Sequence, residues 1–312
     1  MEKKKIFIDG REGTTGLRIF ERLAGRDDIE MLVLPEETRK DPAARKAMLH
    51  QAYAAFLCLP DDAARESAAL AEGSDVILID TSTAHRTDPA WAYGFPELSP
   101  ESEAKIRGAK RIAVPGCHAS GFVALIHPLV RAGVLPADAA LSCFSVTGYS
   151  GGGKKMIAQY EAQERDAALD SPRQYALTQK HKHLPEMQVI PGLAIPPIFC
   201  PIVADYYSGM TVTVPVFASQ LKAGTAPDDL RAIYKNIYAG GLVSYDESIA
   251  VDGFAAANTF SMKDDMKIAV AGNDERILLI SHFDNLGKGA SGAAVQCLNL
   301  VLGQDMAYGL NV

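Results

Sequence analysis

The sequence predicts an α/β protein whose first half is a helix-covered parallel sheet and whose second half is a mixed α+β domain. Four short apolar strands alternate with helical segments between residues 5 and 80, a pattern typical of parallel sheets with helices on both faces. In the second half, the β-branched segments 209–216 and 276–281 flank a helical segment at 227–238. A chain of 312 residues suits two domains.

The end of the chain is expected to return to the first domain. Its last helical segment, 293–302, is almost wholly apolar and therefore needs a surface against which to be buried. We expect one domain of residues 1–116 and 290–312, and a second domain of residues 117–289.

Composition excludes several classes of protein. A net charge of −7 without a basic run argues against nucleic acid and anionic membranes as partners. The basic start at residues 1–5 resembles a secretory leader, but the apolar stretch behind it breaks at Asp9 and is too short. Five scattered cysteines without CxxC spacing disfavour disulfides and structural zinc, so we expect a cytoplasmic protein.

A glycine-rich turn follows the first strand. Residues 5–9 are apolar and run into Gly10, Gly13 and Gly16, after which residues 17–23 are amphipathic. Strand, glycine turn and helix form the context of a dinucleotide-binding loop, although the spacing is GxxGxxG rather than GxGxxG. The alternative is an ordinary turn between a strand and a helix.

Charged residues follow the second strand, 29–34, where a dinucleotide enzyme binds its ribose. Glu36 or Glu37 would accept a hydrogen bond from a ribose 2′-hydroxyl, whereas Arg39 and Lys40 would bind a 2′-phosphate. We favour NADP, with a simply solvated Arg-Lys pair as the alternative. A helix at 42–51, a strand at 54–59, a helix at 63–71 and a strand at 76–80 continue the alternation.

The strand that ends at Asp80 leads into the loop 81–86, at a sheet edge where ligands bind. Arg86 in this loop offers a planar, bidentate grip on a phosphate or carboxylate. Its alternative role is a loop arginine paired with Asp88. The next segment, 93–98, is predicted to be irregular, and a helix is expected at 101–107.

Cys117 stands at a junction between a strand and a helix. The apolar run 112–114 stops at Pro115 and Gly116, and an apolar helical segment begins after the cysteine. A thiol at a helix N-terminus is favoured as thiolate by the backbone N–H groups and the helix dipole. The sequence therefore offers a nucleophile, with a small buried structural cysteine as the alternative.

Two further segments contain candidate functional residues. After a strand at 140–147, three consecutive glycines precede Lys154 and Lys155, and a helix is predicted at 156–168. Such a backbone can approach an anionic ligand closely. His181 and His183 lack a third His or Cys at a metal-ligand spacing, so we expect no metal and predict a general base here instead.

Taken together, these segments resemble the N-acetyl-γ-glutamyl-phosphate reductase family, and its shorter form more than its longer one. The matching segments are 10–16, 80–86, 93–98, 115–121, 148–155, 181–186 and 285–292. The resemblance implies a Rossmann-like NADP-binding domain and an α+β catalytic domain that carries the interface of a homo-oligomer, a dimer or a tetramer. It also implies NADPH-dependent reduction of an acyl phosphate to a semialdehyde through a cysteine thioester, in arginine biosynthesis.

Carried over position by position, the resemblance makes Cys117 the nucleophile and His181 the acid/base. The side chains that it places around the small-molecule substrate are Arg86, Ser150, Tyr175, His183 and Glu186. With the glycine loop and Arg39 included, the expected cofactor contacts are Gly10, Gly13, Thr14, Thr15, Gly16, Arg39, Ser82, Asn285, Gly287 and Gly289.

Two positions depart from the family pattern. The longer relatives carry Asn-Pro-Gly-Cys-Tyr, whereas this chain has His118 after the cysteine. His118 is therefore a rival base, although a neighbour in the same helix start is expected to point away. The glycine loop has Arg11 and Glu12 where many relatives have small residues.

Two other functions remain open from the sequence. Aspartate-semialdehyde dehydrogenase shares the order of glycine loop, cysteine and histidine, but its substrate carries a free α-amino group. The segments 148–155 and 181–186 favour the reductase. An NADP-binding regulator that lacks catalysis is the alternative from another class.

Overall fold

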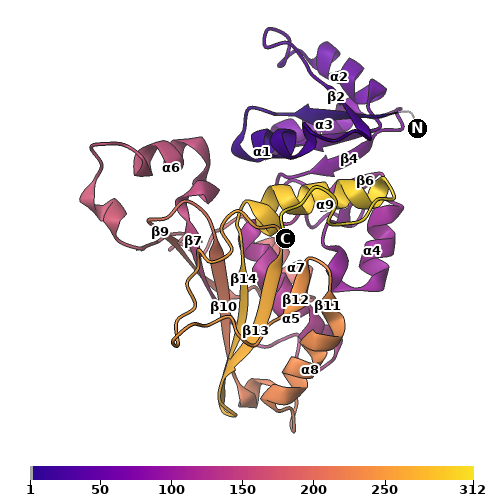
Figure 1. Cartoon of the computed structure of the whole chain (residues 1–312). Coiled ribbons are helices and arrows are strands. Elements are labelled where there is room, and N and C mark those ends of the chain that lie inside the picture. Colours follow the sequence, from indigo (N-terminus) through magenta and orange to yellow (C-terminus); the bar gives the residue numbers. More distant parts are fainter. Residues whose placement is uncertain (1–2) are drawn as a thin grey trace. The chain divides into compact units, whose positions relative to one another are not determined.

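The computed structural model describes residues 3–312, so Met1 and Glu2, the start of the segment considered as a leader, lie outside the described residues. The chain forms two compact units (Figure 1). The first unit holds the described residues up to Pro96, together with Pro100–Gly116 and Ala290–Leu310. The second unit holds Glu97–Ser99, Cys117–Gly289 and Asn311–Val312.

A six-stranded parallel sheet forms the centre of the first unit, in the order β2-β1-β3-β4-β6-β5. The strands are β1 (Lys4–Asp9), β2 (Ile29–Leu32), β3 (Ala54–Leu57), β4 (Ile77–Asp80), β5 (Ala92–Tyr93) and β6 (Arg111–Ala113). Strand order reverses between β1 and β3, which is where open α/β sheets bind their ligands. The predicted parallel sheet is confirmed.

Helices cover both faces of this sheet. They are α1 (Thr14–Leu23), α2 (Pro42–Gln51), α3 (Asp61–Leu70), α4 (Pro100–Arg107) and α9 (Gly292–Val301). Ile19 of α1, Ile106 of α4 and Leu298 of α9 pack with Phe56 in one core. Leu49 of α2 packs in the other. Residues 292–300 of α9 are all buried, which agrees with the largely apolar sequence of this helix.

The second unit is built on an eight-stranded mixed sheet in the order β11-β12-β13-β14-β10-β7-β9-β8. Its strands are β7 (Ser142–Gly148), β8 (Arg173–Gln174), β9 (Ile198–Ala204), β10 (Met210–Phe217), β11 (Ala239–Gly240), β12 (Val243–Tyr245), β13 (Met266–Gly272) and β14 (Arg276–Phe283). The helices are α5 (Cys117–Arg131), α6 (Gly153–Tyr160), α7 (Leu184–Val189) and α8 (Pro227–Ile237). The α+β character predicted for the second half is confirmed.

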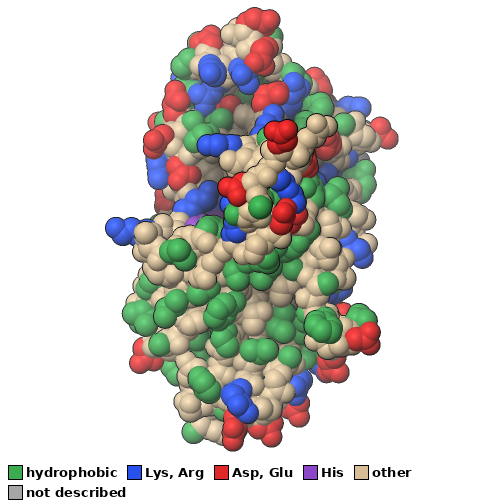
Figure 2. Space-filling view, turned by 90° about the vertical axis from the view of Figure 1, so that its left-hand side faces the viewer, with side chains coloured by type: hydrophobic (Ala, Val, Ile, Leu, Met, Phe, Trp, Pro, Cys, Tyr) green, Lys and Arg blue, Asp and Glu red, His purple; other side chains and the backbone are tan. Residues whose placement is uncertain are grey.

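The two faces of the mixed sheet differ in what covers them. Val212 and Val214 of β10 point to the buried face, where α5 packs on β10 and β14. The opposite face leaves Phe144, Phe217 and Leu278 between 39% and 60% exposed. Hydrophobic side chains gather on the surface in the lower half of Figure 2. Among the described residues, no helix is long and apolar enough to span a membrane.

Two local predictions are wrong. The helix expected at 156–168 ends at Tyr160, because Arg165 donates a hydrogen bond to the Tyr160 carbonyl (2.8 Å) and forms ion pairs with Asp170 and Asp205. These side-chain contacts turn the chain away from the helical path. The segment 93–98 is also more regular than expected, since Tyr93 ends β5 and Pro96–Leu98 form a 3₁₀ turn.

Candidate active site

Cys117 is the first residue of α5 and is partly exposed. The residues before it, Val114 to Gly116, are buried at the end of β6. Glycines let α5 and the thiol sit close to their neighbours. A Cβ on Gly289 would lie 2.9 Å from the Cys117 Cβ, and one on Gly121 would lie 2.5 Å from Val212. The sequence thus places the thiol at a helix N-terminus in a tightly packed setting.

Arg86 supports the strand end that precedes the cysteine. It is 8% exposed, and its guanidinium donates to the carbonyl oxygens of Val114 and Thr81, each at 2.9 Å. Both of these hydrogen bonds go to backbone oxygens, which neither of the two predicted roles, the grip on an anion or the pairing with Asp88, includes. Arg86 therefore holds the backbone at Val114, three residues before the thiol.

Three histidines and a tyrosine gather within the second unit. The ring of His118 lies edge-on to His181 with centroids 5.9 Å apart, and its centroid is 5.5 Å from that of His183. Its Nε2 is 2.7 Å from the Tyr175 hydroxyl, and Phe199 packs against both His118 and His181. His118, the second residue of α5, therefore aims its side chain into this cluster, where its Nδ1 lies 2.6 Å from Ser145 of β7.

Burial keeps His118 and His181 neutral. It lowers the pKa of His118 to about 3, and the nearby His181 and Lys182 reinforce the shift. Burial also lowers the pKa of His181 to about 4, again with a contribution from Lys182. Both rings are therefore uncharged near neutral pH, and each has one N–H and one lone pair.

The backbone selects one tautomer of His181. The N–H of His183 donates to the His181 Nδ1 at 3.2 Å, so this nitrogen carries the lone pair. A neutral ring must then hold its proton on Nε2. His181 is therefore arranged as a hydrogen-bond and proton donor through Nε2.

The segment that carries these groups is anchored at both ends. The Tyr175 N–H donates to the Pro201 carbonyl, and the Gln179 side chain makes two hydrogen bonds with the backbone of Phe199. Ala176 and Gln179 have φ of 53° and 55°, a conformation that costs energy for residues other than glycine. The anchors offset this strain and hold the loop that leads to His181.

Asn285 and Ser150 position each other. The Asn285 amide donates to the Ser150 hydroxyl at 3.0 Å and accepts from the Gly209 N–H at 2.9 Å. Next to it, Asp284 accepts from the N–H groups of Leu286 and Gly287. Asn285 is 1% exposed, so in this structure its side chain supports the turn at Ser150 from inside the protein.

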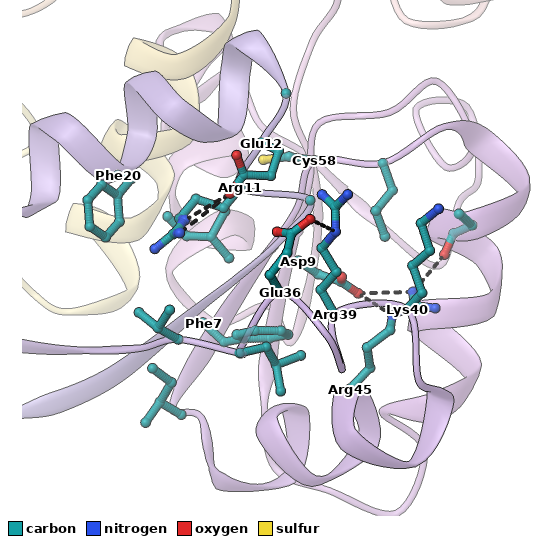
Figure 3. A pocket seen from close by; sticks show the side chains of 18 of the residues that line it. Phe7, Asp9, Arg11, Glu12, Phe20, Glu36, Arg39, Lys40, Arg45 and Cys58 are labelled. Atoms are coloured by element: carbon teal, nitrogen blue, oxygen red, sulfur yellow. Dashed lines mark hydrogen bonds and ion pairs between the residues drawn. The ribbon is translucent and has the colours of Figure 1, made fainter.

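A separate cavity of about 590 Å³ lies within the first unit, around the glycine loop (Figure 3). Gly10 has φ of +87°, and a Cβ there would lie 2.3 Å from the Cys58 carbonyl oxygen. A Cβ on Gly16 would lie 2.6 Å from the Gly10 carbonyl oxygen. Since α1 begins at Thr14 without a side-chain cap, its N-terminus suits a phosphate, and the cavity fits a dinucleotide.

Cations and carboxylates line the same cavity. Arg39 forms an ion pair with Glu36 at 2.8 Å, and Lys40 lies beside them (Figure 3). Arg45 is buried and donates to Asp9 at 3.0 Å. Arg11 stacks over Phe20 at 5.0 Å from the ring centroid and pairs with Glu12. The cavity therefore presents Arg39 and Lys40 as cations available to an anionic group that displaces Glu36.

The predicted residues fall into three groups. Gly10, Gly13 and Arg39 line the cavity of the first unit, and Thr14, Thr15 and Gly16 start α1 beside it. Ser82, in the same unit, donates to Asp80 at 2.7 Å. Cys117, Ser150, Tyr175, His181, His183, Glu186, Asn285, Gly287 and Gly289 all belong to the second unit.

Sequence reasoning missed several participants. Arg45 and Glu66 line the cavity from α2 and α3, and Ser145 of β7 lies 2.6 Å from His118. None of them stands in a local motif. The alternation of β7 gave a signal for Ser145 alone, since a polar residue on the buried face of a strand requires a partner.

Comparison with known proteins identifies the class. A family model described as semialdehyde dehydrogenase, NAD binding domain, matches residues 5–106, and one described as semialdehyde dehydrogenase, dimerisation domain, matches residues 117–285. Aspartate semialdehyde dehydrogenase II from Vibrio cholerae, solved in complex with ASA, has the same fold: TM-score 0.73 over 97% of this chain and 99% of the other, at 18% identity. The chain thus has the semialdehyde dehydrogenase fold, with a nicotinamide cofactor domain.

Closer relatives narrow the class. The N-acetyl-gamma-glutamyl-phosphate reductase of Sinorhizobium medicae (strain WSM419) is 45% identical over 308 residues, which cover 96% of this chain and 99% of the relative. The N-acetyl-gamma-glutamyl-phosphate reductase 2 of Pseudomonas putida (strain KT2440) is 42% identical over 315 residues, 99% of this chain and all of the relative. The chain belongs to the N-acetyl-γ-glutamyl-phosphate reductase family.

Proposed function

We propose that this enzyme reduces N-acetyl-γ-glutamyl phosphate to N-acetylglutamate semialdehyde and phosphate with NADPH, in arginine biosynthesis. The observation that supports this most is 45% identity over 96% of the chain to a reductase of that name. The site agrees with the chemistry, since a partly exposed thiol at the start of α5 shares the second unit with neutral His181.

Cys117 is the proposed nucleophile. Its thiolate attacks the acyl carbon, the bond from that carbon to the phosphate oxygen breaks, and phosphate leaves with the electron pair. The α5 N-terminus stabilises the thiolate before attack. The product is a thioester on Cys117, which accepts hydride more readily than an oxygen ester does.

His181 and Tyr175 are the proposed hydrogen-bond donors to the substrate oxygen. A bound nicotinamide cofactor supplies the hydride. As negative charge develops on the former carbonyl oxygen, the His181 Nε2–H and the Tyr175 hydroxyl can each stabilise it. The C–S bond then breaks, the aldehyde leaves, and Cys117 returns as thiolate.

The cofactor is proposed to be NADP, held by the first unit at the glycine loop. Arg39 and Lys40 line the cavity, and an incoming 2′-phosphate would replace Glu36 as the partner of Arg39. The five cysteines are free and the proposed reaction needs a reduced Cys117, so we place the enzyme in the cytoplasm.

Arg39→Gln should raise the KM for NADPH about tenfold and leave the KM for NADH nearly unchanged, because the arginine would contact only the 2′-phosphate. Initial rates with both cofactors measure this. Lys46→Gln, an exposed change on α2 outside the cavity, is the control. An equal rise for both cofactors would contradict the assignment.

The second unit is proposed to form a dimer or tetramer through the exposed face of its mixed sheet. Leu278 pairs with Pro215 across β14 and β10, and Phe144 pairs with Thr213 across β7 and β10. Such a contiguous apolar face suits a second copy. The family model that matches this unit is described as a dimerisation domain.

Phe144→Glu combined with Leu278→Glu should lower the oligomeric mass measured by analytical ultracentrifugation, because buried carboxylates oppose association. Both side chains are exposed within one chain, so the fold should persist. Leu17→Glu, at an exposed leucine of α1, is the control. An unchanged mass would place the interface elsewhere.

The substrate is tested by running the reaction backwards. The enzyme is given N-acetylglutamate semialdehyde or aspartate semialdehyde, with phosphate and NADP. Turnover of the acetylated aldehyde alone supports the proposal. Preference for aspartate semialdehyde would support the dehydrogenase alternative, and no turnover of either would support a regulator.

A further inference from the structure

A buried chain of three hydrogen-bonding groups leads from the sheet to the proposed substrate site. Ser145 Oγ of β7 lies 2.6 Å from His118 Nδ1, and His118 Nε2 lies 2.7 Å from the Tyr175 hydroxyl. Ser145 is fully buried and His118 is 3% exposed. Tyr175, at the outer end, is half-buried.

His118 joins the two hydroxyl groups as a neutral ring. Burial, with His181 and Lys182 nearby, lowers its pKa to about 3. A neutral imidazole has one donor and one acceptor nitrogen. The direction of the hydrogen bond at Ser145 therefore fixes the direction of the hydrogen bond at Tyr175.

Burial of Ser145 selects the direction. Within residues 3–312, the only hydrogen-bond partner found for its hydroxyl is His118 Nδ1. If Ser145 accepted from Nδ1–H, its own O–H would be buried without an acceptor, which costs roughly 1–3 kcal/mol for a hydroxyl. Ser145 therefore donates, and His118 carries its proton on Nε2.

The protonation of His118 on Nε2 determines which group donates in its hydrogen bond with Tyr175. The His118 Nε2–H donates to the tyrosine oxygen, so the phenol proton is left to donate elsewhere. Within residues 3–312 no other partner of the Tyr175 hydroxyl is found. Burial, and after it the charge of Cys117, raises the pKa of Tyr175, so the phenol keeps its proton.

We propose that Ser145 and His118 are positioning residues that keep the Tyr175 O–H turned toward the substrate oxygen, and that His118 is not the base. This inference rests on the proposed function for the identity of the acceptor, the oxygen of the acyl group on Cys117. In this arrangement Tyr175 is a catalytic donor, and the two residues behind it act only through it.

Kinetics of single variants test the chain of contacts. Tyr175→Phe should lower kcat about a hundredfold, the scale expected for one lost donor to a developing oxyanion. Ser145→Ala should lower kcat about tenfold. Ser281→Ala removes another fully buried hydroxyl from the same sheet, on β14, and should leave kcat unchanged.

Two amide substitutions of His118 test its hydrogen bonds to Ser145 and Tyr175 separately. Gln at this position reaches the place of Nε2 and can donate to Tyr175, whereas Asn reaches only the place of Nδ1. His118→Gln should stay within about threefold of the parent kcat and His118→Asn should fall about tenfold. The pH profile of kcat/KM should keep its shape in both, whereas loss of a limb would make His118 the base.

A double-mutant cycle distinguishes positioning from a general structural effect. Ser145→Ala added to Tyr175→Phe should cost nothing further, because the serine acts only through the phenol. A full additional tenfold loss in the double variant would overturn the proposal.

The tautomer gives a readout that needs no activity. Nitrogen-15 NMR of protein labelled at histidine, with the His118 signals assigned from His118→Gln, should show a protonated Nε2 and a bare Nδ1 from pH 5.5 to 8. A protonated Nδ1, or titration in that range, would overturn the proposal. A parent enzyme that turns over neither semialdehyde would instead refute the proposed function, and the NMR result would still decide the tautomer.

Discussion

Cys117→Ser is expected to abolish NADP-linked oxidation of the semialdehyde and to leave NADP binding intact. A serine hydroxyl at a helix N-terminus stays protonated at neutral pH, whereas a thiol there is substantially ionised. The oxygen ester that serine would form is also a poorer hydride acceptor than a thioester. The loss should therefore exceed the range of most single substitutions at the site.

Two measurements define this result. Phosphate-dependent production of NADPH should fall below detection, and the Kd for NADP should stay within about twofold, because the cofactor cavity lies in the first unit. Cys200→Ser, at another partly exposed thiol of the second unit, is the matched control and should keep its turnover. Near-normal turnover of Cys117→Ser would refute the thioester mechanism.

Chemical modification of the thiols also tests whether Cys117 is the nucleophile. Iodoacetamide should inactivate the enzyme at the rate at which it labels Cys117. Cys58 and Cys143 should compete poorly, because burial raises the pKa of Cys58 to about 12 and raises that of Cys143 as well. A chain that only binds NADP would show no rate linked to labelling at Cys117.

Local pattern was enough to predict most of the first unit. The strands of its sheet are short runs rich in apolar residues, and three of its helices, α2, α3 and α4, begin at Pro or Asp, as α2 does at Asp41 and Pro42. The second unit was less predictable, since β7 pairs with β9 and β10, which both lie far away in the sequence. Their pairing depends on tertiary contacts that no local period reveals.

In the candidate site, too, some features follow from the local sequence and others depend on tertiary contacts. The place of Cys117 at the start of a helix was predictable from the order of strand, turn and helix. The orientation of His118 was not, because it depends on where β7 places Ser145 and where the strained turn at Ala176 places Tyr175. A helix start gives two neighbouring side chains different directions, but only the packed neighbours decide which of them meets the other catalytic groups.

His181 and His118 should contribute very differently to turnover. His181→Asn is expected to slow turnover on the order of a thousandfold, within the range for a lost acid/base group. His118→Asn should slow it only about tenfold, because it disturbs the orientation of Tyr175 and leaves the proton-transfer group in place. Paired measurements of kcat on the same substrate test the order, and the reverse order would make His118 the acid/base.

The dependence of kcat/KM on pH should reflect the titration of His181. Burial lowers its pKa to about 4, so the ring is neutral, with Nε2–H as donor, at every pH well above 4. In the free enzyme kcat/KM should therefore hold steady from pH 8 down to about 5 and fall only as His181 gains its second proton near 4. The fall comes from lost orientation, because the protonated ring keeps its Nε2–H but its Nδ1 can no longer accept from the His183 N–H. The low-pH limb should disappear in His181→Asn, whereas a limb near 6.5 in the parent enzyme would contradict the buried, neutral state of this ring.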